Sequence, residues 1–350
     1  MNYSMLFFFF LILIIVGCGT DSNPNEIEMN WGIVELNESQ ILSVSFSDNI
    51  LFAGTENGAY KLNIESDIEW EEIGLHSDTT DVTKIISLNS EHIFATLRYD
   101  TIRNEDKVLF ESTDGGSSWE GWTLEITGAS NSYSYLYFLD YDNNDPNVLY
   151  GYSGYILRSN NTGQIWEQIF TGNVSEFLYV SKDHSNQIWT GGWNNTFSPY
   201  LAKSSDGGEN WKVLNEEISF NTDSNVYAVA VHKEDEEAVL AGFGGATNAA
   251  NVIRKSEDGG GSWETVLNGY NIRSLKNSDL QLNRVYASGR SPQGQLFVAI
   301  SDNYGDSWEI ETYEESPAGI QTNDMVVTEV NGNETIYFGT NKGVYSLSFE

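Results

Sequence analysis

Short segments in which apolar and polar residues alternate recur along the chain, and most are bounded by glycine, asparagine, aspartate or serine. Examples are ILSVSFS and NILFAGT early in the chain, and VYAVAVHK and AVLAGFG further on. An alternation with a period of two is typical of β-strands, because successive side chains of a strand point to opposite faces of the sheet. No comparable helical segment follows the apolar N-terminus. The pattern therefore predicts an all-β protein.

Seven tryptophans divide these strands into repeats. They are spaced by 39 to 52 residues, and each opens a short strand such as WEQIF or WETVLN. Three further strands fit between consecutive tryptophans, so that each repeat holds four strands, which is the content of one blade of a β-propeller. The seven are Trp31, Trp70, Trp119, Trp166, Trp211, Trp263 and Trp308.

A small residue after the apolar run marks the second strand of every repeat, and seven such marks predict seven blades. The last blade lacks a fourth strand, because the sequence stops after GVYSLSF. We expect WGIVEL, residues 31–36, to supply that strand and to close the ring, which would hide both open sheet edges. The marks are Gly54, Thr96, Gly151, Gly191, Gly242, Ser288 and Gly339.

An eight-residue pattern, Ser-x-Asp-x-Gly-x-Ser-Trp, stands between the third and fourth strands of five repeats; we call these segments the repeated turns. The serine and aspartate oxygens can accept backbone N–H bonds, the glycine can adopt a positive φ, and the tryptophan can be buried between blades. Asparagine replaces aspartate in two copies and cannot act as a general base, so we interpret the turns as structural. Their residues are Ser112, Asp114, Gly116, Trp119, Ser159, Asn161, Gly163, Trp166, Ser204, Asp206, Gly208, Trp211, Ser256, Asp258, Gly260, Trp263, Ser301, Asn303, Gly305 and Trp308.

The repeated turns resemble the Asp-box, or BNR, repeat of sialidases, sortilin-type receptors, xyloglucanases and photosystem II assembly-factor propellers. The resemblance covers nearly the whole chain after residue 30 and implies a seven-bladed β-propeller of four-stranded antiparallel blades. It does not settle activity, because this fold carries many functions. A sialidase would have an Arg-Ile-Pro motif, which is absent here. A xyloglucanase would have paired aspartates in a cleft between two propellers, and this chain has length for one.

The N-terminal apolar run from Met5 to Val16 suits the core of a signal peptide and is shorter than the roughly 20 residues that span a bilayer. The run ends in Ile-Val-Gly-Cys and resembles the bacterial lipoprotein box, although no Lys or Arg precedes it. Cys18 is the only cysteine in the chain. We therefore predict a lipoprotein signal peptide at 1–17, a lipidated Cys18 with a polar tether at 18–30, and a propeller at 31–350, anchored at the outer membrane or cell surface of the bacterial envelope. An ordinary signal peptide with an incidental cysteine is the alternative.

Charge and composition exclude several classes of function. Lys and Arg number 17 against 51 Asp and Glu, which gives a formal net charge of -34. Such a field repels phosphate backbones and anionic lipid surfaces, so we expect no nucleic-acid partner and contact with membrane through the lipid anchor alone. The four histidines have no metal-ligand spacing, and no glycine-rich phosphate loop opens a helix. We therefore predict no metal and no cofactor.

The face opposite the repeated turns is where we expect a ligand. The connections between second and third strands are long in blades 2, 4 and 5, with the sequences RYDTIRNEDK, GWNNTFSPY and GFGGATNAAN. Long loops on a rigid scaffold commonly carry binding residues, and aromatic rings with scattered polar groups suit a peptide or a sugar. The alternative is that these rings only pack their own loops. The candidate ligand-binding residues, centred on Trp193, are Arg98, Tyr99, Arg103, Tyr152, Trp193, Tyr200 and Phe243.

No residue is assigned a catalytic role. The sequence favours an exported, lipid-anchored, non-catalytic module that binds or assembles with a protein, peptide or glycan at the cell envelope. The alternative is a glycoside hydrolase that acts on extracellular glycans. Turnover of labelled glycans by the purified protein distinguishes the two.

Overall fold

The computed structural model describes residues 28–36, 39–66, 69–75, 80–99, 106–127, 135–218 and 224–350. The predicted signal peptide, Cys18, most of the polar tether and Arg103 lie outside the described residues. The side chain of Tyr99 lies outside them as well. Within the described ranges, no helix is long and apolar enough to cross a bilayer.

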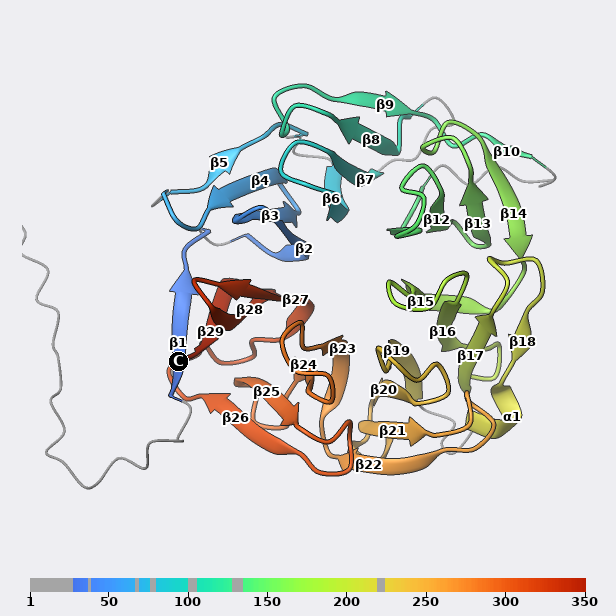
Figure 1. Ribbon diagram of the computed structural model, residues 1–350, viewed down its shortest axis with the longest axis vertical. Coiled ribbons are helices and arrows are strands. Elements are labelled where there is room, and N and C mark those ends of the chain that lie inside the picture. The colour runs from blue at the N-terminus through green and yellow to red at the C-terminus, as the bar shows by residue number, and fades with distance from the viewer. Residues whose placement is uncertain are drawn as a thin grey trace, which may run out of the picture.

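Seven β-sheets stand around a common axis, as blades of a propeller (Figure 1). Four antiparallel strands follow one another in every blade, so that the first strand lies nearest the axis and the fourth at the rim (Figure 1). The predicted fold class is therefore confirmed. Two single-turn helices interrupt the described strands, α1 (Asn215–Ile218) and η1 (Asn248–Ala250).

The strands of the first four blades have the following bounds. Blade 1 consists of β2 (Ile41–Ser47), β3 (Ile50–Thr55), β4 (Gly58–Asn63) and β5 (Glu71–Glu72). Blade 2 consists of β6 (Thr80–Ser87), β7 (Ile93–Tyr99), β8 (Leu109–Ser112) and β9 (Glu120–Trp122). Blade 3 consists of β11 (Phe138–Tyr141), β12 (Leu149–Tyr152), β13 (Ile156–Ser159) and β14 (Trp166–Phe170). Blade 4 consists of β15 (Val174–Val180), β16 (Ile188–Trp193), β17 (Pro199–Ser204) and β18 (Lys212–Val213).

The last three blades complete the ring. Blade 5 consists of β19 (Ser224–Val231), β20 (Val239–Gly245), β21 (Val252–Ser256) and β22 (Glu264–Asn268). Blade 6 consists of β23 (Asn271–Asn277), β24 (Val285–Arg290), β25 (Leu296–Ser301) and β26 (Glu309–Tyr313). Blade 7 consists of β27 (Thr322–Val330), β28 (Asn333–Thr340), β29 (Gly343–Phe349) and β1 (Met29–Val34).

Blade 3 carries an additional strand that the sequence pattern did not predict. The short strand β10 (Ile126–Thr127) runs parallel to β14 at the rim, with Ile126 opposite Trp166. The backbone N–H of Trp166 also donates to Glu125 O at 2.9 Å. The link from blade 2 to blade 3 therefore covers the outer edge of the sheet, which would otherwise be open for pairing.

The N-terminal strand closes the ring, as predicted. β1 pairs antiparallel with β29 over six residues, with Trp31 opposite Leu347. In Figure 1 the blue β1 accordingly lies along the red β29, which is the last strand of the chain. The Trp31 ring stacks on Tyr313 and on Phe338, with 5.5 Å between ring centroids in each case. Because Tyr313 belongs to blade 6, this one ring joins the closing strand to two blades.

The hydrophobic core is distributed over the contacts between neighbouring blades. One cluster joins Trp189 and Leu201 of blade 4 to Val229 and Phe243 of blade 5. The partly buried Trp263, from the repeated turn of blade 5, packs against the same cluster. Each blade therefore depends on its neighbours for burial, which is why closure of the ring stabilises the whole domain.

The small residues that mark the second strands explain how closely the blades approach. A Cβ atom added to Gly242 would lie 2.5 Å from Ile272 Cγ2, on the first strand of the next blade. In blade 6 the small residue is Ser288, whose Oγ lies 2.7 Å from Thr322 Oγ1 of blade 7. A larger side chain at Gly242 or Ser288 would push the blades apart, and Gly54 and Gly339 face the next blade in the same way, whereas Gly151 and Gly191 are crowded by their own blades.

The five repeated turns share one hydrogen-bond pattern. In the fourth copy, Ser256 Oγ donates to Asp258 Oδ1 at 2.9 Å and accepts the N–H of Gly260 at 2.8 Å. Asp258 Oδ1 also accepts the N–H of Ser262 at 2.7 Å. Gly260 has a φ of +92°, and Trp263 Nε1 donates to its carbonyl oxygen at 3.1 Å. The tryptophan bond is not common to all five copies, because Trp119 Nε1 donates to Ile73 O instead. The bonds of the serine, of the acid or amide, and of the glycine recur in every copy, so these three residue types have a structural role.

Asparagine performs the role of aspartate where it replaces it. Asn303 Oδ1 accepts from Ser301 Oγ at 3.0 Å and from the N–H of Ser307 at 2.9 Å. Its Nδ2 then donates to Ser307 Oγ at 2.9 Å, where an aspartate oxygen would accept. The turn therefore requires the shape and the acceptor of the side chain, and it does not require the negative charge.

Candidate functional site

Two cavities lie along the axis, and both are lined mainly by the first strands of the blades. The first, of about 160 Å³, lies at the end where these strands begin. The second, of about 400 Å³, lies at the end where they finish, on the side of the repeated turns. We call the first cavity the channel mouth. It is on the face where the sequence led us to expect a ligand.

β-Bulges shape the channel mouth. In six blades the pairing of the first strand with the second shifts by one residue near its start, and the shift leaves one extra residue without a partner in the ladder. A bulge re-aims a side chain, and here every extra side chain lines the same cavity. The blade without this shift contributes Phe138. The six bulge residues are Leu42, Thr83, Glu176, Tyr227, Arg273 and Asn323.

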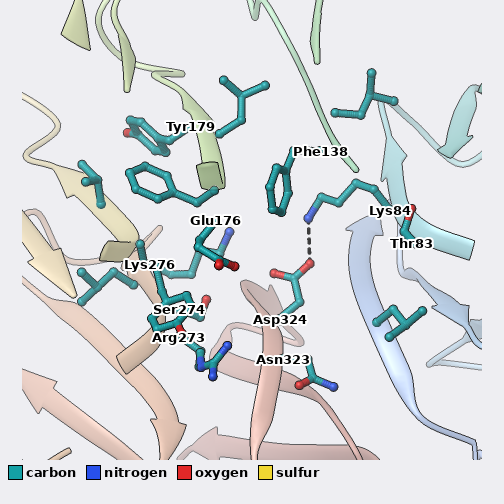
Figure 2. Close-up of a pocket in the computed structure, with 18 residues that line it drawn as sticks. Thr83, Lys84, Phe138, Glu176, Tyr179, Arg273, Ser274, Lys276, Asn323 and Asp324 are labelled. Carbon is teal, nitrogen blue, oxygen red and sulfur yellow. Dashed lines mark hydrogen bonds and ion pairs between the residues drawn. The ribbon is translucent and has the colours of Figure 1, made fainter. Parts of the chain in front are cut away.

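Glu176 is the acidic residue among the six bulge residues. Its Oε1 accepts a hydrogen bond from Trp193 Nε1 at 3.1 Å. Burial raises the pKa of Glu176, and the indole hydrogen bond and the charge of Arg273 only partly oppose the rise. Figure 2 shows the carboxylate pointing into the cavity. Glu176 is therefore an incompletely solvated acid at the entrance of the channel.

Arg273 is the basic residue among the six bulge residues, and its guanidinium contacts one residue of blade 5 and one of blade 6. Its Cζ lies 3.9 Å from the centroid of the Tyr227 ring, a cation–π contact. Its Nε donates to Asn271 Oδ1 at 3.1 Å. The guanidinium is thus held against blade 5.

A network of charges lies deeper in the channel. Lys84 Nζ donates to Asp324 Oδ2 at 2.7 Å, across the space between blades 2 and 7 (Figure 2). The same oxygen accepts from Ser43 Oγ at 3.0 Å. Burial alone would raise the pKa of Asp324, but the charges of Lys84 and Lys276 outweigh it and lower that pKa. Burial lowers the pKa of Lys276.

The charge of the axis differs from that of the rest of the protein. The residues that line the two cavities include five of the 17 Lys and Arg and five of the 51 Asp and Glu. The other 12 basic and 46 acidic residues lie elsewhere, so the formal charge of -34 belongs to the chain outside the channel lining. At the far end, ion pairs join Lys182 to Asp140 at 2.7 Å and Lys233 to Asp279 at 3.2 Å.

The structure places Trp193, the last residue of β16, beside the channel mouth: it does not line the cavity, but it is hydrogen-bonded to Glu176, which does. Its ring stacks on Phe197 with 5.1 Å between centroids and 8° between planes. Phe197 is 63 % exposed and has a φ of +57°. Asn194 holds this turn, because its Oδ1 accepts the backbone N–H of Thr196 at 2.9 Å and of Ser198 at 3.0 Å. We call Trp193 and Phe197 together the aromatic platform.

Three other candidate aromatics are in the interior. Tyr152, Tyr200 and Phe243 are 9 %, 1 % and 0 % exposed. They belong to strands that continue further than the sequence pattern indicated, and their rings face the packing between blades. A Cβ on Gly172 would lie only 2.2 Å from the Tyr200 hydroxyl oxygen, which shows how tightly that ring is enclosed. These three rings therefore pack in the interior from strands, and not within their own loops as the alternative from the sequence had it.

Of the two basic residues predicted to bind a ligand, the structure describes Arg98 and not Arg103. Arg98 lies near the end of β7 with its side chain 48 % exposed, and it forms an ion pair with Asp81 of the adjacent strand. Arg103 and the side chain of Tyr99 lie outside the described residues.

Sequence reasoning missed Glu176, Arg273 and Phe197. The first two stand in the first strands, in VSEFLYV and IRSLKN, where they look like ordinary solvent-facing positions. A detectable signal existed, because in both strands two polar residues follow one another, at 175–176 and 273–274, and break the alternation as a bulge requires. Phe197 stood in a loop already selected, but its positive φ and its stacking on Trp193 are visible only in three dimensions.

No cluster of three or more His, Cys, Asp or Glu placed to hold a metal ion occurs in the part of the chain that the structure describes. No family model matches the chain, and no curated protein matches it.

Solved structures show the fold. A GH74 xyloglucanase from Xanthomonas campestris matches with a TM-score of 0.66 and 14 % identity over 91 % of this chain and 53 % of its own. YCF48 bound to D1 peptide matches with a TM-score of 0.63 and 14 % identity over 95 % and 98 %. A chain of the mitotic checkpoint complex matches with a TM-score of 0.61 and 13 % identity over 100 % and 98 %. This chain thus spans about half of the xyloglucanase and nearly all of the other two, and at these identities the likeness establishes a β-propeller and no activity.

Proposed function

We propose that this chain is an exported, lipid-anchored propeller that binds a segment of a partner protein over the channel mouth and does not catalyse a reaction. The observation that carries the proposal is the ring of bulge residues. Six blades use the same backbone irregularity to direct one side chain each into a single cavity. Bulges are common next to functional sites, and here they supply apolar, hydrogen-bonding and charged groups together.

The shape of the channel mouth favours a peptide that lies across it. At about 160 Å³ the cavity is smaller than the roughly 300–1,000 Å³ typical of small-molecule pockets. It suits the insertion of one side chain, with the rest of the segment resting on the rim. The exposed Phe197 stacks on Trp193, which is hydrogen-bonded to Glu176 of the cavity, and so offers an aromatic contact beside it.

Two similar structures support a protein ligand by analogy of fold. One is described as YCF48 bound to D1 peptide, and the other belongs to the mitotic checkpoint complex. Both are covered almost completely by this chain, so the compared unit is a whole propeller in each case. As part of the proposal we assign the repeated turns to the Asp-box type, because their hydrogen bonds follow from the Ser, Asp and Gly of that pattern.

The lipid anchor at Cys18 is a separate part of the proposal and rests on sequence alone. Replacing Cys18 with Ser should move the protein from the membrane fraction to the soluble fraction and should abolish the uptake of labelled acyl chains. A variant that fractionates and incorporates label as the wild type does would contradict the anchor, and it would leave the binding proposal intact.

Site-specific photocrosslinking tests the binding proposal. A photoreactive phenylalanine analogue placed at Phe197, in intact cells, should yield a defined crosslinked protein. The matched control is the same analogue at Leu280, which is 48 % exposed and lies on the opposite face, between β23 and β24. The same products from both positions, or products from Leu280 alone, would contradict a site at the channel mouth.

A glycoside hydrolase is the second candidate, and one observation favours it. Two carboxyl groups with opposite pKa shifts line the same cavity: the pKa of Glu176 is raised and that of Asp324 is lowered. Such a division suits an acid and an ionised partner. However, Lys84 and Ser43 already occupy Asp324, which makes it a poor nucleophile or base. Release of sugars from xyloglucan by the purified chain, lost in Glu176→Gln, would establish this candidate instead.

A further inference from the structure

Among the described residues, no cation lies at hydrogen-bond distance from the Glu176 carboxylate. Within that part of the chain, the one side chain that donates a hydrogen bond to it is the neutral indole of Trp193, at 3.1 Å. The ion pairs formed among the described residues do not include it. An ionised acid that is partly removed from water is stabilised strongly by a cation at hydrogen-bond distance.

Arg273, the base whose charge acts on Glu176, does not fill this role. Arg273 influences Glu176 through its charge, yet its guanidinium rests on the Tyr227 ring at 3.9 Å and its Nε donates to Asn271. The two lysines deeper in the channel interact with Asp324. Lys84 donates a hydrogen bond to its carboxylate, and the charge of Asp324 raises the pKa of Lys276 against the effect of burial. The carboxylate is therefore free to receive a cation from outside.

The aromatic platform lies beside the Glu176 carboxylate, because Trp193 donates a hydrogen bond to that carboxylate and is also one of the two rings of the platform. Aromatic faces attract ammonium and guanidinium groups, and the attraction grows when the cation is partly desolvated. Phe197 is kept 63 % exposed in a left-handed conformation that a bulky side chain rarely adopts. Backbone strain of this kind is characteristic of functional positions.

The charge of the protein points in the same direction. The chain outside the channel lining carries the whole formal charge of -34. Such a field raises the concentration of basic segments near the surface and repels acidic ones.

We infer that the segment bound over the channel mouth presents a lysine or arginine side chain, whose cationic group is received between the Glu176 carboxylate and the aromatic platform. This inference rests on the proposed function and specifies its ligand. The planar guanidinium of arginine can pair with the carboxylate and stack on a ring at once, so arginine is the preferred residue.

Two probes test the inference. The first is the tryptophan fluorescence of the purified full chain during titration with N-α-acetyl-arginine amide and, separately, with the isosteric but neutral N-α-acetyl-citrulline amide. The same titrations of Trp193→Phe are subtracted, so that the remaining change in fluorescence belongs to Trp193. The second is a screen of a random peptide library on the immobilised chain. The arginine amide should bind about tenfold or more tightly than the citrulline amide, because a hydrogen bond to a charged group is worth more than one to a neutral group.

Glu176→Gln should remove this preference. The matched control is Glu56→Gln, which makes the same change of charge at an exposed turn on the same face, and it should retain the preference. Equal binding of the two amides, or an unchanged preference in Glu176→Gln, would overturn the inference. Enriched peptides without lysine or arginine would overturn it and leave the proposed function standing. An arginine preference without any enriched peptide would support the cation site and count against the proposed function.

Discussion

Closure of the ring by β1 makes the stability of the whole domain depend on one aromatic side chain. Trp31→Ala removes two stacked contacts, with Tyr313 and Phe338, each with centroids 5.5 Å apart. Aromatic pairs contribute about 0.5–1.5 kcal/mol each beyond the burial of area. Loss of about 100 Å² of buried apolar surface adds about 2.5 kcal/mol at 25 cal/mol per Å². We therefore expect the free energy of unfolding to fall by about 3.5–5.5 kcal/mol, which overlaps the range of about 3–5 kcal/mol for large-to-small aromatic substitutions.

Thermal unfolding followed by circular dichroism measures this effect. For a domain of this size, a loss of about 3 kcal/mol corresponds to a fall in Tm of about 5 °C. The matched control is Ile33→Ala in the same strand, where the side chain is 59 % exposed and the substitution should change little. If Trp31→Ala melts at the temperature of Ile33→Ala, β1 does not hold the ring closed and the reasoning fails.

Three further predictions concern the repeated turns and the aromatic platform. Asp258→Asn should change stability by less than about 0.5 kcal/mol, whereas Trp263→Ala should cost roughly 3 kcal/mol in denaturant unfolding, because asparagine can reproduce the turn but alanine cannot replace the ring. Hydrogen bonds from Ser262 and Ser256 lower the pKa of Asp258 to about 2 from 3.8. The ionised acid therefore stabilises the fold above its unfolded pKa, and that contribution is lost as the pH falls towards 2. Asparagine does not ionise, so Asp258→Asn should flatten the acid limb of the Tm–pH curve. Phe197→Asn should keep or raise Tm, because asparagine tolerates the φ of +57°, while it should weaken the binding of the partner segment identified by crosslinking.

Each of these predictions has a clear contrary result. A large loss of stability in Asp258→Asn would mean that the charge of the turn matters, and parallel Tm–pH curves for wild type and variant would mean that its ionisation is not linked to folding. A lower Tm in Phe197→Asn would show that the exposed ring supports the fold, which would remove the reason for treating its conformation as functional.

The repeated turns and the number of blades could be predicted because their causes are local. A serine, an acid or amide, and a glycine close a turn through bonds that span two to four residues, as at Ser256, Asp258 and Gly260. The mark at Gly242 also recurs with the blade period, so it can be counted without knowing that Ile272 of the next blade requires it. Closure by β1 followed from counting strands.

The channel mouth could not be predicted in the same way, because its residues meet only after the ring forms. Glu176 and Arg273 come from first strands of different blades and share a cavity through bulges, which depend on pairing with the second strand. Tyr200 and Phe243 were assigned to loops, but β17 and β20 extend through them and turn their rings inwards. Trp193 is the last residue of β16, and its ring remains partly exposed beside the channel mouth.

The affinity of the crosslinked partner segment for wild type and for Trp193→Ala is the most direct test of binding at the channel mouth. Trp193 supplies one ring of the aromatic platform and the hydrogen bond that positions Glu176, so its loss removes two contributions to the site. A central aromatic contact is worth about 2 kcal/mol or more, so the Kd should rise by more than about tenfold while Tm stays within about 2 °C of the wild type. An unchanged Kd in Trp193→Ala would place the site elsewhere on the propeller.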